Sequence, residues 1–292
     1  MADRRRINGP AAATNPPVFL ASSKAETASA CRVRDNDSIR AAFLKTGVTP
    51  TASGSAYLEV EKQVSPSQTS RAPNGMKLIC TVHGPRALPR SAPFSPHLVL
   101  STHVKYAPFA TRQRRGYLRD TSERDLSEHL ETALRGSIIA ERWPKSGVEV
   151  IVTIIEGDEA CDSVEGINNS EWDMMNVLAG CITVASAAIA DAGIDTVDTV
   201  SGGVAALVPG TGGQAPAVVL DPVPSEHEEI LAMCCVAYMP SRDEITNLWI
   251  KGQMAAENSG VHLQLMSRAV QAAKGSRSVL SGSLMEVVRA GC

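Results

Sequence analysis

The segment MMNVLAGCITVASAAIADAG, residues 174–193, constrains the fold of this chain more than any other stretch. Its pattern predicts a helix that ends at Gly193 and that is apolar on nearly all sides. A helix without a polar face is stable only when it is buried. Its longest apolar run, Ile182–Ala190, is far shorter than the roughly 20 residues that span a membrane. We therefore expect a helix in the core of a layered protein that makes no membrane contact.

Strands and two further helical segments surround this core helix. An amphipathic helix is expected over residues 121–138, with Thr121 or Ser122 as its N-cap. Four strands precede that helix and read as an antiparallel meander. The last segment, 253–288, is helical in period with two weak glycine breaks. The expected strands lie within residues 39–60 (two strands), 76–85, 97–109, 148–155, 198–208, 215–223 and 234–252 (two strands).

This order of elements predicts an α+β protein in which mixed sheets are packed with helices. The length of 292 residues suits one large domain, which we place at residues 38–292. Residues 1–37 are rich in Ala, Pro, Ser and Arg and have no periodicity. We expect them to form an extended N-terminal arm.

The net charge and the cysteine spacing argue against a strongly basic nucleic-acid-binding protein, a zinc protein and a disulfide-rich protein. The formal net charge of -3 predicts no global attraction to nucleic acid, so any such contact requires a local basic patch. The chain has 7 cysteines, without a CxxC pair or the spacing of a zinc site or disulfide framework. We expect reduced, mostly buried thiols, no metal and no cofactor.

Five short motifs follow one another in an order that resembles the RNase PH family. The resemblance covers roughly residues 39–266. Each motif alone is a weak signal, but the motifs together in this order identify the family much more specifically. The opening DRRRINGPAAA resembles ring members of this family in the eukaryotic exosome. The motifs are GSAYLEV (54–60), HGPR (83–86), SERDLSEHLETAL (122–134), AIADAGI (188–194) and LDP followed by EE (220–229).

The resemblance implies an RNase PH-like fold, of the ribosomal S5 domain 2-like type, that assembles as a hexameric ring. Single-stranded RNA is threaded through the pore of such a ring. In eukaryotic exosome rings the six subunits are different proteins and are largely inactive. The partners implied are other RNase PH-like ring subunits, S1/KH-type cap proteins and single-stranded RNA. The implied location is the nucleus and nucleolus, and also the cytoplasm.

The catalytic positions implied by the family are degenerate in this sequence. Active members carry a Gly-Gly-Thr-Arg-type run that binds phosphate, and its place here falls on residues 175–178, which end at Leu178. The family also places two aspartates six residues apart. Asp221 retains the first, but His227 stands at the second, and Glu226 is one residue early. We expect Asp221 to cap a strand that leads into a short solvated acidic bend. A metal site of Asp221, Glu226 and His227 is the alternative.

The densest basic stretch, TRQRRGYLRD at residues 111–120, is the expected contact with RNA. Arginine and lysine neutralise backbone phosphates, and the corresponding loop of RNase PH-like rings faces the pore. A solvated loop, or one that pairs with a neighbouring subunit, is the other interpretation. Arg86 in HGPR is expected to fix its loop or to touch RNA. The candidate RNA-binding residues are Arg112, Arg114, Arg115, Arg119, Lys105 and Arg86.

Three functions remain open from the sequence. The first is a non-catalytic subunit of the exosome ring that helps to form the RNA channel. The second is an active phosphate-dependent 3'–5' exoribonuclease in which Glu226 supplies the acid. The third is a regulatory binding protein outside any ring. A phosphate site is required for the second function. The resemblance places the family's arginines at Leu178 and around Ser122, and Arg124 is the alternative for the second of them.

Overall fold

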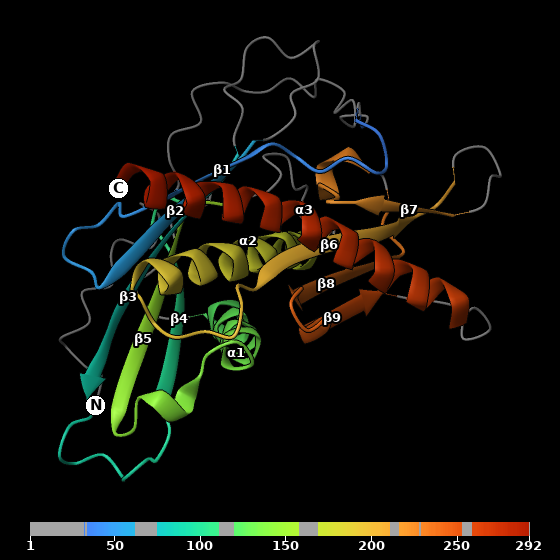
Figure 1. The fold of residues 1–292 in the computed structure, drawn as a ribbon. Helices are drawn as coiled ribbons and strands as arrows, with labels where there is room; N and C mark the ends of the chain where they lie inside the picture. The colour runs from blue at the N-terminus through green and yellow to red at the C-terminus, as the bar shows by residue number, and fades with distance from the viewer. Residues whose placement is uncertain are drawn as a thin grey trace, which may run out of the picture.

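A computed structural model of the chain describes Arg32 and residues 34–61, 75–110, 120–157, 169–210, 216–227, 229–252 and 259–291. Within these ranges, two sheets and three long helices alternate in layers (Figure 1). A five-stranded sheet packs on α1 and α2, a four-stranded sheet packs on their other side, and α3 covers the outer face of the second sheet. The α+β class with mixed sheets is therefore as expected.

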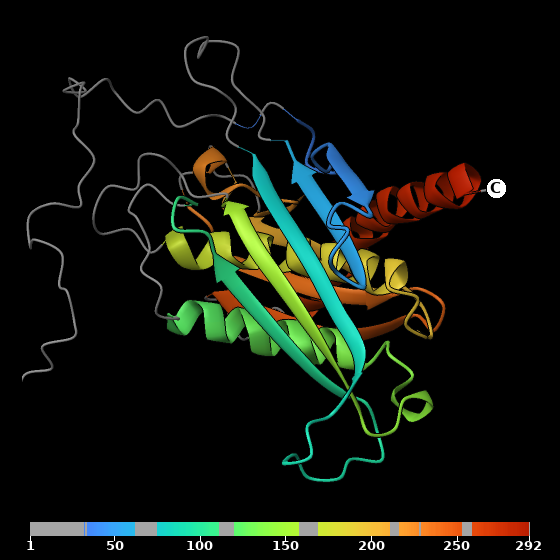
Figure 2. The ribbon, with the colours of Figure 1, turned by 90° about the vertical axis from the view of Figure 1, so that its left-hand side faces the viewer.

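The five-stranded sheet has the order β1-β2-β3-β5-β4 (Figure 2). Its inner face is buried against the helices, whereas alternate residues on its outer face are half-exposed. This alternation is typical of a sheet with one covered face. The strands are β1 (Ala42–Thr46), β2 (Gly54–Val60), β3 (Met76–Ala87), β4 (Val99–Tyr106) and β5 (Ser146–Glu156).

The predicted meander of the first four strands is wrong at its fourth strand. β5 lies between β3 and β4, and β4 pairs with β5 in parallel rather than with β3. The chain between β4 and β5 carries α1 (Thr121–Arg135), which crosses over the inner face of the sheet. Parallel neighbours need such a crossover, and a helix is its usual form.

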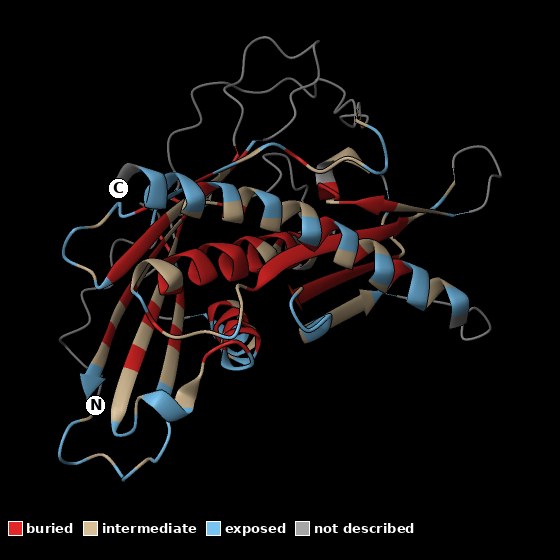
Figure 3. Ribbon diagram, viewed as in Figure 1, coloured by how far each residue is buried: buried red, intermediate tan, exposed pale blue. Residues whose placement is uncertain are grey.

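The four-stranded sheet has the order β7-β6-β8-β9 and is antiparallel throughout. β6 and β8 are almost completely buried because both of their faces are covered by helices (Figure 3). β9 is an edge strand and is only half-covered. The strands are β6 (Ser201–Val208), β7 (Ala217–Leu220), β8 (Ala232–Met239) and β9 (Glu244–Gly252).

The core helix is α2 (Asn169–Asp191), and it lies between the two sheets. Its segment Trp172–Asp191 is long and apolar enough to cross a membrane, but 83% of that window is buried inside this protein. Glycines permit the close packing. A Cβ on Gly180 would lie 2.6 Å from the Cε atom of Met76, and one on Gly202 would lie 2.2 Å from the carbonyl oxygen of Ala179. The expected burial of this helix is confirmed.

α1 begins with a capping box, but the N-cap is Asp120 rather than Thr121 or Ser122. The Asp120 carboxylate accepts from the backbone N–H of Thr121 at 2.7 Å, and Glu123 closes the reciprocal bond to the backbone N–H of Asp120. Glu123 is buried and also accepts from the backbone N–H of Tyr106, which attaches α1 to β4. Glu123, whose acidic side chain in the first turn helps to predict the helix start, therefore also makes a tertiary contact.

The C-terminal segment is one continuous helix, α3 (Ser259–Gly291), so the predicted glycine breaks are wrong. Gly275 lies where α3 passes close to the start of the first sheet. A Cβ there would meet the Cδ1 atom of Ile39 at 2.5 Å, whereas one on Gly282 would meet nothing within 4 Å. A glycine costs a helix about 1 kcal/mol relative to alanine, which the long packed face of α3 offsets.

Candidate functional site

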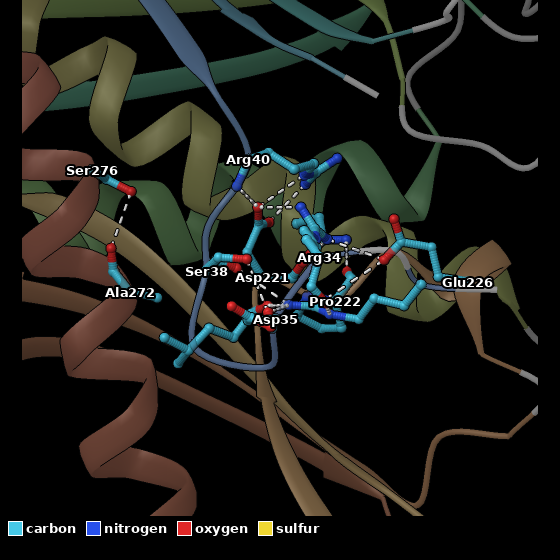
Figure 4. Close-up of polar contacts among 12 residues, drawn as sticks. Arg34, Asp35, Ser38, Arg40, Asp221, Pro222, Glu226, Ala272 and Ser276 are labelled. Carbon is cyan, nitrogen blue, oxygen red and sulfur yellow. Dashed lines mark hydrogen bonds and ion pairs between the residues drawn. The ribbon is translucent and has the colours of Figure 1, made fainter. Parts of the chain in front are cut away.

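Asp221 directly follows β7 and is held by Arg40 from the segment that leads into β1 of the other sheet (Figure 4). Its Oδ2 atom accepts from both the backbone N–H and the Nε of Arg40 at 2.9 Å, and its Oδ1 accepts from Nη2 at 2.8 Å. The backbone N–H of Asp221 donates to Val204 on β6. The residue adopts a positive φ of 46°, which turns the chain sharply away from the sheet.

Arg34 joins Asp221 to Glu226. Its Nη1 lies 3.5 Å from Oδ2 of Asp221, and its Nη2 lies 3.1 Å from Oε2 of Glu226. Arg32 lies on the same cluster, with Nη1 3.6 Å from Oε2 of Glu226 and Nη2 donating to the carbonyl of Leu220. The side chains of Arg34 and Glu226 are only 6% and 7% exposed. Two carboxylates are thus neutralised by three guanidinium groups of the same chain.

The electrostatics of this cluster follow from burial and charge. Burial by itself raises the pKa of Asp221, but the charge and hydrogen bonds of Arg40, together with Arg34, more than offset this and lower that pKa well below its usual range. Burial, and the neighbouring Arg34, lower the pKa of Arg32 to about 10. Asp221 and Arg32 therefore both remain charged at neutral pH.

His227 follows the 3-10 helix η3 (Pro224–Glu226) and lies at the edge of the cluster. Burial, followed by the charges of Arg32 and Arg34, lowers its pKa to about 4. The ring is therefore neutral at physiological pH. Its Nε2 atom is buried and has no hydrogen-bond partner among the residues that the structure describes.

The expected solvated acidic bend is wrong at Glu226, which is buried beside its arginine partners, whereas Glu229 is exposed. The structure does not support the alternative, a metal site of Asp221, Glu226 and His227, either. Arg34 occupies the space between Asp221 and Glu226, and no group of three His, Cys, Asp or Glu side chains spaced to hold a metal occurs in the described part of the chain. The cluster is a closed ion-pair network, and such networks need a charge partner for every buried ion.

Comparison with known sequences shows to which family the chain belongs. The sequence model of RNase PH, described as "3' exoribonuclease family, domain 1", matches residues 38–195. The chain belongs to the RNase PH family. The family expected from the five motifs is confirmed.

Relatives cover nearly the whole chain. The Exosome complex component MTR3 of Chaetomium thermophilum is 59% identical over 289 residues, which are 99% of this chain and 100% of the relative. The Schizosaccharomyces pombe protein of that name is 30% identical, with 98% and 96% covered, and the human one is 30% identical, with 86% and 84% covered. These names agree with the resemblance of the opening residues to an exosome ring member of the mRNA transport regulator type.

A solved structure confirms the RNase PH-like fold. The crystal structure of rice (Oryza sativa) Rrp46 superposes with a TM-score of 0.64 at 16% identity, and the match covers 87% of this chain and 98% of the rice chain. At this identity the likeness concerns the fold alone.

The place expected for the RNase PH phosphate run, residues 175–178, lies inside the core. Met175 and Leu178 are 0% exposed, and Asn176 is 2% exposed. α2 begins at Asn169, so the backbone N–H of Leu178 lies within the helix and not among its free N-terminal donors. A phosphate bound at a helix start requires those free N–H groups. The sequence predicts that the phosphate-binding motif is lost, and the residues at its expected place are buried within a helix.

The structure separates the candidate RNA-binding residues. Arg112, Arg114, Arg115 and Arg119 lie outside the described residues, so their contact with RNA stays a prediction. Lys105 and Arg86 are both exposed. They pair with Thr153 and Gly147 of β5, which are six residues apart and hence roughly 20 Å distant. These two side chains do not belong to one patch.

The surroundings of Arg86 differ from those of Lys105. Arg86 Nη2 lies 3.5 Å from Nδ1 of His83, which is a contact within β3, so the expectation that Arg86 fixes its loop or touches RNA stays a prediction. Phe94 in the following loop is 71% exposed, and the ammonium of Lys145 lies 5.4 Å from its ring centroid. The backbone of Leu88 bonds to Lys145, which joins this loop to the start of β5.

Sequence reasoning missed the three arginines of the cluster. Arg32 and Arg34 lie in the segment that is expected to form an extended arm, and no sequence pattern marks Arg40. The signal that points to the first two is their spacing in CRVR, which places both side chains on one side of an extended chain. Nothing local indicates their partners, since Arg34 and Glu226 are 192 positions apart.

Proposed function

We propose that this chain is a non-catalytic structural subunit of an RNA exosome ring and helps to form the channel through which single-stranded RNA is threaded for 3'–5' processing and decay. The names of the relatives support this, since three proteins called Exosome complex component MTR3 match it over most of their length. The alternative is an active phosphate-dependent exoribonuclease, because the family takes its name from that activity.

One observation favours the non-catalytic function. The only carboxylate retained at a family position, Asp221, is engaged by Arg40 and Arg34, and Glu226 is engaged by Arg34. An acid that acts in phosphorolysis must reach the scissile linkage or a metal ion. These two carboxylates are instead bound within the protein, and the one side-chain amide of segment 175–178, that of Asn176, donates to the carbonyl of Pro222.

The partners that follow are other RNase PH-like ring subunits, S1/KH-type cap proteins and single-stranded RNA. Edge strands with apolar side chains support subunit contacts. Phe43 on β1 is 57% exposed, and Ile245 and Leu248 on β9 are each 42% exposed. The apolar helix α2 does not need such a partner, because this chain buries it. The proposed location is the nucleus and nucleolus, and also the cytoplasm, which imaging of a fluorescent fusion tests.

An activity assay tests the catalytic half of the proposal. The purified chain is incubated with a 5'-labelled single-stranded RNA, inorganic phosphate and Mg²⁺. We expect neither shortening of the RNA nor release of nucleoside diphosphates. Phosphate-dependent release that is lost in Asp221→Asn would replace this proposal by the active enzyme.

Co-purification tests the structural half. We expect the tagged chain to bring down other RNase PH-like subunits in equal amounts, and native mass spectrometry to give a hetero-oligomer. The control is a variant with Phe43→Ser, Ile245→Ser and Leu248→Ser on the two edge strands, in which assembly should weaken. A wild-type chain that stays monomeric without family-like partners would support the third function, a regulatory binding protein.

A further inference from the structure

We propose that the α3 side of β9, together with the flank of α3 beside it, is a docking surface for one amphipathic α-helix of another protein of the exosome assembly. The inference rests on the proposed function for the identity of the partner, whereas the surface itself follows from the packing of this chain. The residues of this β9 surface are Ile245, Leu248 and Ile250 on β9 and Leu263, Met266 and Val270 on α3.

The register of the four-stranded sheet places three apolar side chains of β9 on its α3 side. Directly paired residues of neighbouring strands lie on the same face of a sheet. The partners on β8 all belong to the core cluster beneath α3, and they are Tyr238 for Ile245, Val236 for Leu248 and Cys234 for Ile250. The three β9 side chains therefore face the α3 layer, yet Ile245 and Leu248 are each 42% exposed.

α3 presents an apolar flank toward β9. Met266, Val270 and Lys274 follow one another at intervals of four residues, so they lie on one side of the helix. Lys274 identifies that side, because its ammonium lies 5.4 Å from the ring centroid of Tyr238 on β8, the strand next to β9. Met266 and Val270 are partly buried against the same core cluster, and Leu263 in the preceding turn is 67% exposed.

One helix is too narrow to cover this face of the sheet. α3 packs most extensively on β6 and then on β8, and β9 lies beyond β8 at the edge. Strands are about 4.8 Å apart, so β9 is roughly 10 Å from β6. Packed helices are separated by about 8–10 Å, so a second helix beside α3 would lie over β9. The opposite face of the sheet has this arrangement, because α2 packs on β6 and β8 while α1 packs on β9.

The geometry of β9 favours a helix over an added strand as the occupant. Thr246 is an extra residue in the ladder, since Ile245 and Asn247 pair with the adjacent Tyr238 and Ala237 of β8. Such a bulge interrupts the row of backbone donors and acceptors and hinders the pairing of another strand with an edge. An apolar face remains, and a helix can cover it without backbone hydrogen bonds.

The β9 surface is positively charged at one end. Lys274 is exposed there, and Arg242 is exposed in the turn between β8 and β9. Of the two neighbouring acids, Asp243 is hydrogen-bonded to Tyr238, and Glu244 faces the α1 side because its partner on β8 lies in the other core cluster. The positive end therefore suits an acidic group of a partner.

The character of the partner helix follows from this apolarity and charge. Its apolar stripe, with residues spaced i, i+3, i+4 and i+7, packs on Leu248 and Val270. The C-terminal end of a helix carries a partial negative charge, to which acidic side chains add. We expect an acidic last turn of the partner helix beside Lys274.

Photo-crosslinking in the purified assembly locates the partner. The photoreactive residue p-benzoylphenylalanine replaces Leu248 in one tagged chain, Leu263 in a second and Gln271, which is exposed on α3, in a third. After irradiation, mass spectrometry identifies the crosslinked peptides. We expect positions 248 and 263 to join the same segment of another exosome protein, one with apolar residues at helical spacing, and position 271 not to join it.

Other results would overturn the proposal. Crosslinks to a segment with the alternating pattern of a strand, or to a second copy of this chain, would assign the surface to a different occupant. An assembly that contains the other ring subunits but gives no crosslink from positions 248 and 263 would show that no helix covers the surface. If no exosome protein co-purifies, the proposed function fails, and this inference fails with it.

Two variants test the contact itself. Leu248→Asp places a charge at the apolar centre of the surface and should lower the recovery of the crosslinked protein at least about tenfold. Lys274→Glu should lower it about fivefold, because an attractive charge pair becomes a repulsive one. Gln271→Glu adds an acid elsewhere on α3 and should leave the recovery as in the wild type. Circular dichroism confirms that each variant is folded, and equal recovery with all three folded variants would refute the docking surface.

Discussion

Arg40 binds Asp221 through two parallel hydrogen bonds, from Nε to Oδ2 at 2.9 Å and from Nη2 to Oδ1 at 2.8 Å. The bond links the segment before β1 to the end of β7, so it connects the two sheets of the protein. The Arg40 side chain is 3% exposed. A bidentate pair in this setting is strong, and its loss leaves a buried charge without a partner.

Asp221→Ala should therefore destabilise the protein by about 3–5 kcal/mol, since Arg40 and Arg34 remain buried with one carboxylate fewer. Urea unfolding followed by far-ultraviolet circular dichroism measures this. Glu229→Ala, at an exposed acid of the same segment, is the control and should change stability by no more than about 0.5 kcal/mol. A stability loss in Asp221→Ala as small as that of the control would show that the pair does not hold the sheets together.

The stability of the protein should fall on acidification between about pH 6.5 and pH 4 because of His227. Its pKa is about 4 in the folded chain and about 6.5 when unfolded, so only the unfolded state takes up a proton in this window. The contribution is complete above pH 6.5 and is lost as the pH falls toward 4, by about 2–3 kcal/mol in total.

His227→Gln tests this pH dependence. The variant should lose most of the decrease in unfolding free energy between pH 6.5 and pH 4.5, as measured by urea titrations at several pH values. His97→Gln, at an exposed histidine, should keep the wild-type slope. If His227→Gln retained the full slope, other groups would be responsible.

Two glycine-to-alanine changes should have opposite effects. Gly203→Ala places a Cβ within 2.2 Å of backbone atoms of α3, which neither element can avoid by a side-chain rotation, and should destabilise by at least about 2 kcal/mol. Gly282→Ala in the open part of α3 meets nothing within 4 Å and should stabilise by about 0.5–1 kcal/mol. Thermal unfolding of both variants measures the difference. Melting temperatures that shift in the same direction would contradict the close approach of α3 and β6.

Replacing Arg112, Arg114 and Arg115 together by Ala should weaken the binding of single-stranded RNA by the assembled ring. If each arginine neutralises one phosphate, the slope of log K against log salt should become shallower by about 2. Fluorescence anisotropy at several salt concentrations gives the slope. Lys105→Ala provides the comparison for a single cation, with an expected change of about 0.7. An unchanged slope in the triple variant would favour contact of this loop with a neighbouring subunit.

The local pattern of residues was enough to predict most of the secondary structure. The periodicity of residues 121–138 indicated α1, and the uniform apolarity of residues 174–193 predicted that α2 is buried. The break at Gly193 agrees with its positive φ of 67°. These features depend on neighbours within a few positions, so the sequence contains the information directly. Alternation of apolar residues likewise indicated the strands, and the order of five motifs indicated the family.

The pairing of strands and the ion-pair cluster were decided by the tertiary structure. β5 enters between β3 and β4 because α1 returns the chain in parallel, and no local pattern distinguishes that arrangement from a meander. The acidic residues after Asp221 predicted a solvated bend, but the Glu226 side chain is only 7% exposed and that of Asp221 19%. These carboxylates can lie there because Arg40 and Arg34, each more than 180 positions away, neutralise them. Burial of a charge depends on its partners in space, and those partners are defined only once the chain has folded.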